Sequence, residues 1–285
     1  MSKNKIFLLF FLFISMIGTT QEKFSFNVKL NSFSSSLPES SDVLGLWHNE
    51  AVIKVLDKLV NSPFLPKQKE FDNLLITSLE DFCTTKGINV KLDFAGDYEV
   101  CLDNAERLNI CSSTELSDVA NNVLCRIQSN ANDFINENIS IEEFTVNAEN
   151  LRLEAESLQK DSDKMICGLV ASISKNSFNF WNENFERYYN SFKRKFATLI
   201  SNDNSSNNSG PFADMTLNTD VKKFKKESFR KILWGLVGLS DAGGAWTWAT
   251  WALPFTSIFG ATAAGFAGAC GHSLTSMIGQ VIASL

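Results

Sequence analysis

Residues that could carry out chemistry are few in this chain, and its two histidines are the clearest of them. The 285 residues include only His48 and His272. An imidazole can act as an acid, a base or a metal ligand near neutral pH. His48 stands beside Asn49 in a stretch of helical periodicity, with no second histidine or cysteine within one helical turn. We predict His48 and Asn49 as the candidate functional residues, with a buried structural histidine as the alternative.

The stretch Gly271-His272-Ser273-Leu274 is similar in outline to the G-x-S-x-G elbow that presents the nucleophile of many serine hydrolases. Thr275 replaces the final glycine, and no histidine follows that could serve as the base. The surrounding residues favour a helix over the strand, turn and helix that the elbow requires. The match is therefore a coincidence and predicts no hydrolase.

Other groupings of reactive residue types have structural explanations. Gly265, Gly268 and Gly271 lack the preceding strand and the following lysine of a phosphate-binding loop. The acidic pairs Glu142-Glu143 and Asp161-Asp163 stand at predicted helix starts, where carboxylates stabilise the helix dipole. The sequence also contains no CxxC pair of the kind that binds zinc. We predict that the protein is not an enzyme and that it binds no cofactor and no metal.

The N-terminus has the three-part layout of a secretory signal peptide. Met1–Lys5 is short and positive, Ile6–Gly18 is apolar apart from Ser15, and Gly18-Thr19-Thr20 offers small residues for cleavage. The apolar run is short for a membrane span. We predict that residues 1–20 are a signal peptide and that the protein is exported to the periplasm, the cell envelope or the extracellular space.

Six cysteines follow this segment, and they are Cys83, Cys101, Cys111, Cys125, Cys167 and Cys270. An even number in an exported protein is compatible with disulfides, and six cysteines allow about 15 pairings. Structural or free thiols are favoured over metal binding, and the pairing stays open.

Helical periodicity dominates residues 42–200. The main predicted helices begin at Asp42, at Pro66, at Ser112 with Glu115, at Ser140 with Glu143, and at Asp161. The second of them is predicted to stop at Gly87, and a shorter helix is predicted over 98–108. Apolar residues alternate with polar ones over 22–33 and 88–94, so these stretches could pair as two short strands. The predicted fold class is mainly α, a helical bundle with one small two-stranded sheet and a hydrophobic C-terminal helical hairpin rich in Gly and Ala.

Composition divides the chain after its signal peptide into four regions. An N-terminal extended segment covers 21–41, and a helical domain covers 42–200. The polar run SNDNSSNNSG opens a predicted flexible linker over 201–213. Residues 214–285 form a basic amphipathic helix followed by the hydrophobic tail.

The tail has an unusual distribution of charge. The net charge of the chain is −6, yet residues 222–231 carry +5, so the remainder carries −11. An acidic body argues against nucleic-acid binding, whereas a basic segment can contact anionic lipid. The predicted membrane-contact residues are Lys222, Lys223, Lys225, Lys226, Arg230, Lys231, Trp246, Trp248 and Trp251.

Residues 242–285 contain no Asp, Glu, Lys or Arg. We predict a helix break at Asp241–Gly244 and a turn at Leu253–Phe255 between the two arms of the hairpin. Small residues at close spacing let helices approach and could also support self-association, and the predicted helix-packing residues are Ala261, Gly265, Gly268 and Gly271.

A constitutive membrane span is the least favoured interpretation of this tail, because the tail has little Leu or Ile and its cations would lie on the exported side. Two interpretations stay open. The hairpin packs within a soluble fold, or it inserts into a membrane after release.

Two short stretches carry a resemblance. Leu44-Gly45-Leu46-Trp47-His48-Asn49-Glu50 and Asp241-Ala242-Gly243-Gly244-Ala245 resemble a group of exported bacterial proteins of unknown function, which have a His-Asn pair near the mature start and a Gly/Ala-rich C-terminus. The resemblance covers about a tenth of the chain. It implies an exported, helical bacterial protein and supplies no activity.

Together these features predict an exported, non-enzymatic protein whose C-terminal tail associates with membranes as a bacteriocin-like or pore-forming element. The alternative is a soluble envelope or extracellular binding protein whose tail is packed as core.

Overall fold

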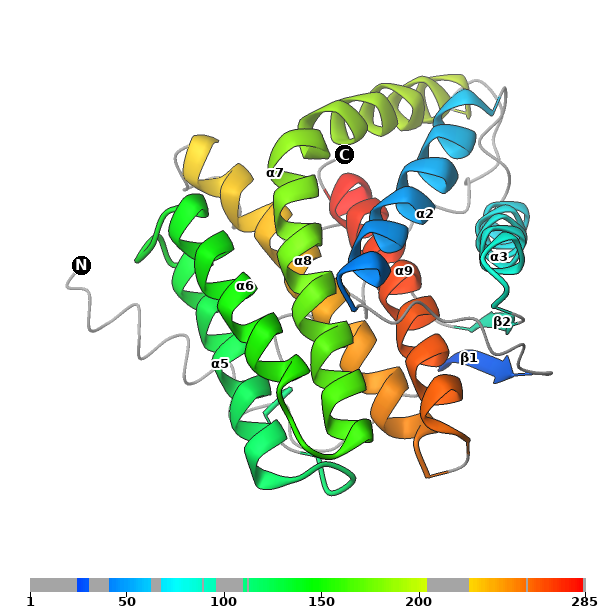
Figure 1. The fold of residues 1–285 in the computed structure, drawn as a ribbon. Coiled ribbons are helices and arrows are strands. Elements are labelled where there is room, and N and C mark those ends of the chain that lie inside the picture. The colour runs from blue at the N-terminus through cyan, green and yellow to red at the C-terminus, as the bar shows by residue number, and fades with distance from the viewer. Residues whose placement is uncertain are drawn as a thin grey trace, which may run out of the picture.

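The computed structural model describes residues 25–30, 41–62, 68–88, 90–95, 110–111, 113–203, 226–254 and 256–283. Seven helices make up almost all of this part of the chain, which confirms the mainly α fold class (Figure 1). They are α2 (Ser41–Asn61), α3 (Gln68–Thr85), α5 (Asp118–Ile135), α6 (Ile141–Glu156), α7 (Asp161–Asp203), α8 (Lys226–Ala252) and α9 (Ile258–Ala283). The predicted signal peptide and the helix predicted over 98–108 lie outside the described residues. α7 continues to Asp203, so the first three residues of the linker predicted over 201–213 are helical, and the rest of that linker lies outside the described residues.

Two short strands accompany the helices. β1 (Ser25–Leu30) pairs antiparallel with β2 (Val90–Ala95), so that Ser25 is opposite Ala95 and Leu30 is opposite Val90. The pair lies beside α3 and α9 at the edge of the helical body (Figure 1).

Local signals in the sequence set several helix ends as predicted. At α6, Ser140 Oγ accepts from the Glu143 N–H at 3.2 Å and the Ser140 N–H donates to Glu143 Oε2 at 2.9 Å, which is the predicted capping box. Gly87 follows α3 with a φ of 76°, a conformation in which glycine has no steric penalty. The helix therefore stops where the sequence predicted.

The predicted start of α5 is wrong by several residues. The N-cap is Ser117, whose Oγ accepts from the Ala120 N–H at 3.3 Å. Glu115 lies in a turn before the helix, and its N–H donates to Ser113 Oγ at 3.2 Å. The segment that was predicted as the first turn of the helix is therefore a loop that precedes it.

The predicted break at Asp241–Gly244 is also wrong, because α8 runs without interruption from Lys226 to Ala252. Each glycine inside a helix costs about 1 kcal/mol relative to alanine. Tight packing opposes that cost, since a Cβ on Gly244 would lie only 2.8 Å from the Gly268 carbonyl oxygen of α9. The glycines thus allow two backbones to meet inside the hairpin.

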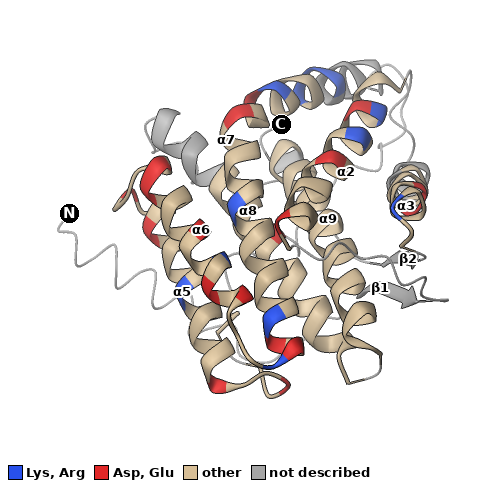
Figure 2. Cartoon of the chain, viewed as in Figure 1, with Lys and Arg blue, Asp and Glu red and all other residues tan. Residues whose placement is uncertain are grey.

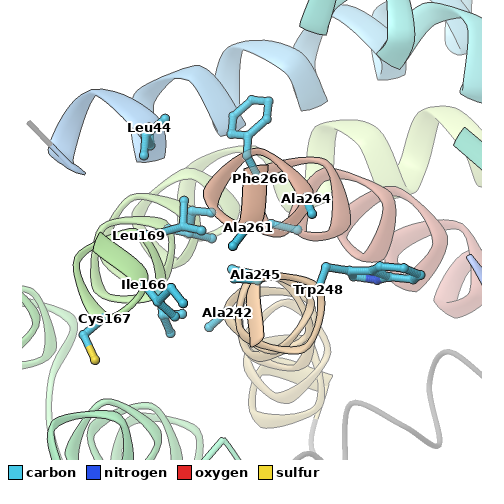
Figure 3. Close-up of a cluster of buried hydrophobic side chains, with 14 of the residues drawn as sticks. Leu44, Ile166, Cys167, Leu169, Ala242, Ala245, Trp248, Ala261, Ala264 and Phe266 are labelled. Carbon is cyan, nitrogen blue, oxygen red and sulfur yellow. The ribbon is translucent and has the colours of Figure 1, made fainter. Parts of the chain in front are cut away.

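The hairpin α8–α9 lies within the fold and not apart from it. Its turn lies at residues 253–254, inside the predicted stretch. α9 runs between α2, α7 and α8 (Figure 1), and one buried cluster combines Leu44 of α2, Leu169 of α7, Ala245 of α8 and Phe266 of α9 (Figure 3). The tail and the body therefore share a hydrophobic core, as in the first of the two interpretations of the tail.

Among the described helices, we find none that combines the length and the apolar character needed to cross a membrane.

The contact between α8 and α9 leads to a prediction for Gly268. A Cβ at this position would lie 2.1 Å from Cδ1 of the buried Trp248 and 2.9 Å from the Gly244 carbonyl oxygen. Overpacking a filled core typically costs about 1–3 kcal/mol, so Gly268→Val should lower the melting temperature by about 2–12 °C. Circular dichroism measures this change. Thr247→Val places the same valine side chain on the exposed face of α8 and should leave the melting temperature unchanged.

Candidate functional site

A buried carboxyl group at the meeting point of four helices is the most unusual polar feature of the described residues. Asp241 of α8 accepts hydrogen bonds at Oδ2 from Ser177 Oγ, from Trp181 Nε1 at 3.2 Å and from Ser273 Oγ at 3.0 Å. His48 Nε2 of α2 lies 3.7 Å from the same oxygen. We call these five residues the Asp241 cluster.

Helical geometry explains how the cluster forms. Ser177 and Trp181 are four residues apart on α7, so both side chains point from one face of that helix. Ser273 lies on the buried middle of α9, and His48 lies on the buried face of α2. The cluster therefore joins the two arms of the hairpin to the helices of the body.

The cluster is sealed from solvent. The Asp241 and His48 side chains are both 0% exposed. Asp241 Oδ1 and His48 Nε2 have no hydrogen-bond partner within the described residues, and such buried orphan atoms are costly. His48 Nδ1 pairs with Asn49 Oδ1 at 3.1 Å, and Asn49 Nδ2 donates to the Asn176 carbonyl oxygen at 2.9 Å.

Burial decides the protonation of both groups. It raises the pKa of the Asp241 carboxyl to about 8, although the hydrogen bonds from Ser177, Ser273 and Trp181 act in the opposite direction. It lowers the pKa of the His48 imidazole to about 4, against the smaller effects of the Asn49 side chain and the Ala269 backbone. At neutral pH the pair is therefore held mainly in its uncharged form.

This arrangement differs from a catalytic triad. Both serine hydroxyl groups donate to Asp241, whereas a nucleophilic serine would contact the histidine. With the carboxyl and the imidazole closed off, a substrate has no route to either group in this conformation. The cluster can hold a proton and fix the four helices in register, and the absence of enzymatic activity stays a prediction.

The second histidine occupies a similar setting. His272 lies on α9, 6% exposed, next to Gly244 of α8. Burial lowers the pKa of its imidazole to about 4. Residues 271–274 belong to a continuous helix, so the resemblance to a nucleophile elbow has no structural counterpart.

The predicted helix-packing residues all lie on the buried part of α9. A Cβ on Gly265 would lie 2.6 Å from the Ala245 carbonyl oxygen, and Gly268 faces Gly244 and Trp248 of α8. Ala261 is fully buried, and Gly271 is buried as well. Gly265 and Gly268 thus pack α9 against α8, its own partner in the hairpin, and self-association through these small residues stays a prediction.

The predicted membrane-contact residues occupy different environments. Trp248 is 9% exposed, Trp246 is half-buried and Trp251 is 57% exposed. Lys226, Arg230 and Lys231 lie in the first turns of α8, but their side chains are outside the described part of the structure. Lys222, Lys223 and Lys225 lie entirely outside it.

His48 and Asn49 were predicted from the sequence, whereas the roles of Asp241, Ser177, Trp181 and Ser273 were not. A signal for Asp241 was present, because it is the only Asp, Glu, Lys or Arg between Ile232 and Leu285. Burying a carboxyl group costs free energy, so an isolated acidic residue in an otherwise uncharged stretch indicates a specific role in the fold. Nothing in the local sequence indicated the two serines.

The described residues offer little else that could bind a ligand. They contain no group of three or more His, Cys, Asp or Glu side chains that could hold a metal ion. A surface pocket between α2 and α3 is lined by Asp57, Lys58, Asn61, Ser62 and Leu74. Asp57 already accepts from Tyr188 Oη at 3.0 Å and from Arg187 at 3.2 Å.

Comparisons with known proteins add no family to this description. No protein-family model, no curated protein and no solved structure matches the chain.

Proposed function

We propose that this is an exported, non-enzymatic protein that associates with membranes through the tip of its C-terminal hairpin. The tip comprises residues 251–259, the turn and its two flanking helix ends. One observation carries the proposal. Trp251 and Phe259, on opposite sides of the turn, are 57% and 44% exposed, and among the described residues they are the aromatic members of the exposed large hydrophobic side chains.

The chemistry of the tip suits a membrane interface. Trp and other aromatic side chains favour the boundary between head groups and hydrocarbon. The chain carries no Asp, Glu, Lys or Arg from 242 to 285, so no charged group opposes entry of the tip into that boundary. Figure 2 shows the contrast, because charged residues mark α2, α3, α5, α6 and α7 while the described part of α9 has none.

The basic segment is a separate feature from the tip. Lys231 and Trp251 are 20 residues apart on one continuous helix, which places them roughly 30 Å apart at 1.5 Å per residue. That distance exceeds the Debye length of about 8 Å at physiological ionic strength. Anionic lipids can attract the lysines, but this attraction at one end of α8 does not bring the tip at its other end into contact with the membrane.

A bacteriocin-like or pore-forming activity would require more than contact by the tip. The arms of the hairpin carry part of the hydrophobic core, so they would have to leave α2 and α7 before they could insert. The proposal therefore concerns association first, with insertion as a later step that needs the core to open.

Flotation with liposomes tests the role of the tip. We expect the protein to float with phosphatidylcholine vesicles, with or without phosphatidylglycerol, and to stay bound in high salt because the tip carries no charge. Burying an exposed Trp or Phe side chain is worth about 2 kcal/mol, so the double variant Trp251→Ser and Phe259→Ser should lose at least about 10-fold in affinity.

A matched control uses exposed aliphatic residues of the body. Leu46 of α2 and Leu153 of α6 are 53% and 51% exposed, and changing both to Ser should leave flotation unchanged. The proposal is wrong if the protein stays in the soluble fraction at every lipid concentration. It is also wrong if neutralising the lysines of 222–231 abolishes flotation while the tip variant still floats.

The pocket between α2 and α3 favours a second candidate, a soluble envelope or extracellular binding protein. Its lining combines charged, polar and apolar groups, with Asp57, Lys58 and Leu74 among them. Such a protein would show ligand-dependent thermal stabilisation that Lys58→Ala removes, and it would not float. Both candidate functions assume that the protein is exported, a prediction that rests on the signal peptide at residues 1–20. N-terminal sequencing of the mature protein tests whether this segment is removed.

A further inference from the structure

Two cysteine thiols lie together where the chain enters α5. Cys111 is in the turn at residues 110–111, and Cys125 is on α5. Cys125 Sγ donates to the Cys111 carbonyl oxygen at 3.6 Å. Both are partly exposed and present as thiols.

The face of α5 that carries Cys125 holds this loop at several points. Gln128 Oε1 accepts from the Ile110 N–H at 2.9 Å and from Cys111 Sγ at 3.4 Å. One turn earlier, Asn121 exchanges two hydrogen bonds with Ser113, at 3.0 Å and 2.9 Å. These contacts hold the loop against α5, so Cys111 stays next to the turn of the helix that carries Cys125.

We propose that Cys111 and Cys125 form a disulfide under oxidising conditions and that it covalently links the loop before α5 to that helix. The described alternatives are poorer partners, because Cys83, Cys167 and Cys270 are all fully buried in the core. Cys111 and Cys125 are both partly exposed, so an oxidant can reach them, and the 3.6 Å contact between Cys125 Sγ and the Cys111 carbonyl oxygen places the two residues side by side. The inference does not depend on membrane association.

The oxidant is a small-molecule disulfide such as oxidised glutathione. One cysteine thiolate attacks a sulfur of the oxidant and forms a mixed disulfide, and one reduced thiol leaves. The second cysteine thiolate then attacks the protein sulfur of the mixed disulfide, and a second reduced thiol leaves. The two cysteines lose two electrons and two protons, which the two departing thiols carry away.

The rate of this exchange should depend on pH. Burial, together with the hydrogen bond and the charge of Cys125, raises the pKa of Cys111 to about 12. Because the thiolate is the nucleophile, we expect slow formation at pH 7 and faster formation as the pH rises.

Mass spectrometry of the full chain tests the proposal. The reduced protein is incubated with oxidised glutathione, treated with N-ethylmaleimide and digested. Trypsin should leave both cysteines on the peptide 108–126, and cleavage after Glu115 separates them. We expect the tryptic peptide to lack two hydrogen atoms and to carry no N-ethylmaleimide, and we expect the two cleaved halves to stay linked until they are reduced.

Single variants identify the partners. Cys111→Ser and Cys125→Ser should each abolish the link, whereas Cys101→Ser should retain it. Oxidation should raise the melting temperature of the wild type by about 5 °C and leave that of Cys125→Ser unchanged. The proposal fails if both cysteines remain open to N-ethylmaleimide after prolonged oxidation, if only mixed disulfides with glutathione form, or if Cys111 links to Cys101.

Discussion

Removing residues 226–285 should abolish the cooperative unfolding transition of the rest of the chain. The deletion takes away α8 and α9, whose buried side chains complete both hydrophobic clusters of the described residues. α2 and α7 would expose the apolar faces that now contact α9, and the remaining helices would lack a common core. Circular dichroism and the binding of a hydrophobic dye measure the loss of the transition and the exposure of apolar surface.

Deleting residues 1–20 serves as the control. We expect this change to preserve the melting transition, because those residues are predicted to be a removable signal peptide. A chain without 226–285 that still melts cooperatively within a few degrees of the full protein would show that the body folds alone. The hairpin would then be an accessory, and membrane insertion of its arms would no longer require the core to open.

The second large effect is a stability maximum near pH 6.5. Burial raises the pKa of Asp241 from 3.8 to about 8, so its contribution to stability is fully present below about pH 4 and is lost as the pH rises towards 8. Burial lowers the pKa of His48 and of His272 from 6.5 to about 4. Their contributions are fully present above pH 6.5 and are lost as the pH falls towards 4.

The pH dependence of the free energy of unfolding follows from how many more protons one state binds than the other. Each proton changes the free energy of unfolding by about 1.4 kcal/mol per pH unit. Between pH 6.5 and 8 Asp241 acts alone among these three groups, so stability should fall by about 2 kcal/mol. As the pH falls from 6.5 to 4, the two histidines lower the free energy of unfolding and Asp241 raises it. The net effect is that of one proton, so the free energy of unfolding should fall by about 3 kcal/mol. Urea unfolding at a series of pH values measures both limbs.

Two conservative variants separate the groups. Asp241→Asn keeps an oxygen that can accept hydrogen bonds but cannot ionise, so the decline between pH 6.5 and 8 should disappear. His48→Gln should remove the larger part of the acid limb, since His272 alone nearly balances Asp241 there. An alkaline decline of unchanged size in the Asp241→Asn protein would show that another group is responsible and that the carboxyl is not held protonated by burial.

Local signals predicted those parts of the fold that depend on neighbours in sequence. The capping box at Ser140, the stop at Gly87 and the turn after Ala252 depend on residues within one or two helical turns, and the structure contains each of them. The predicted break at Asp241–Gly244 is wrong because the contact of Gly244 with Gly268 and His272 comes from a different helix. Tertiary packing can override helix propensity by more than a glycine pair costs.

The candidate site illustrates the same limit. His48 was selected from its residue type alone, yet its neighbour Asp241 in the cluster is 193 positions further along the chain. Helix periodicity indicates which side of α2 faces inward, but it does not say which residue of α8 or α9 faces back. The two stretches that carry the family resemblance meet in the structure through these two side chains, a relation that neither stretch reveals alone.

The central position of α9 has a consequence for how the molecule assembles. α9 is the last of the described helices in sequence, and it lies between helices that are made much earlier. While the ribosome is still producing the preceding helices, α2 and α7 have no partner for the faces that α9 will cover. The nascent protein should therefore stay open for most of its synthesis, and its slowest folding event should be the arrival of this one helix.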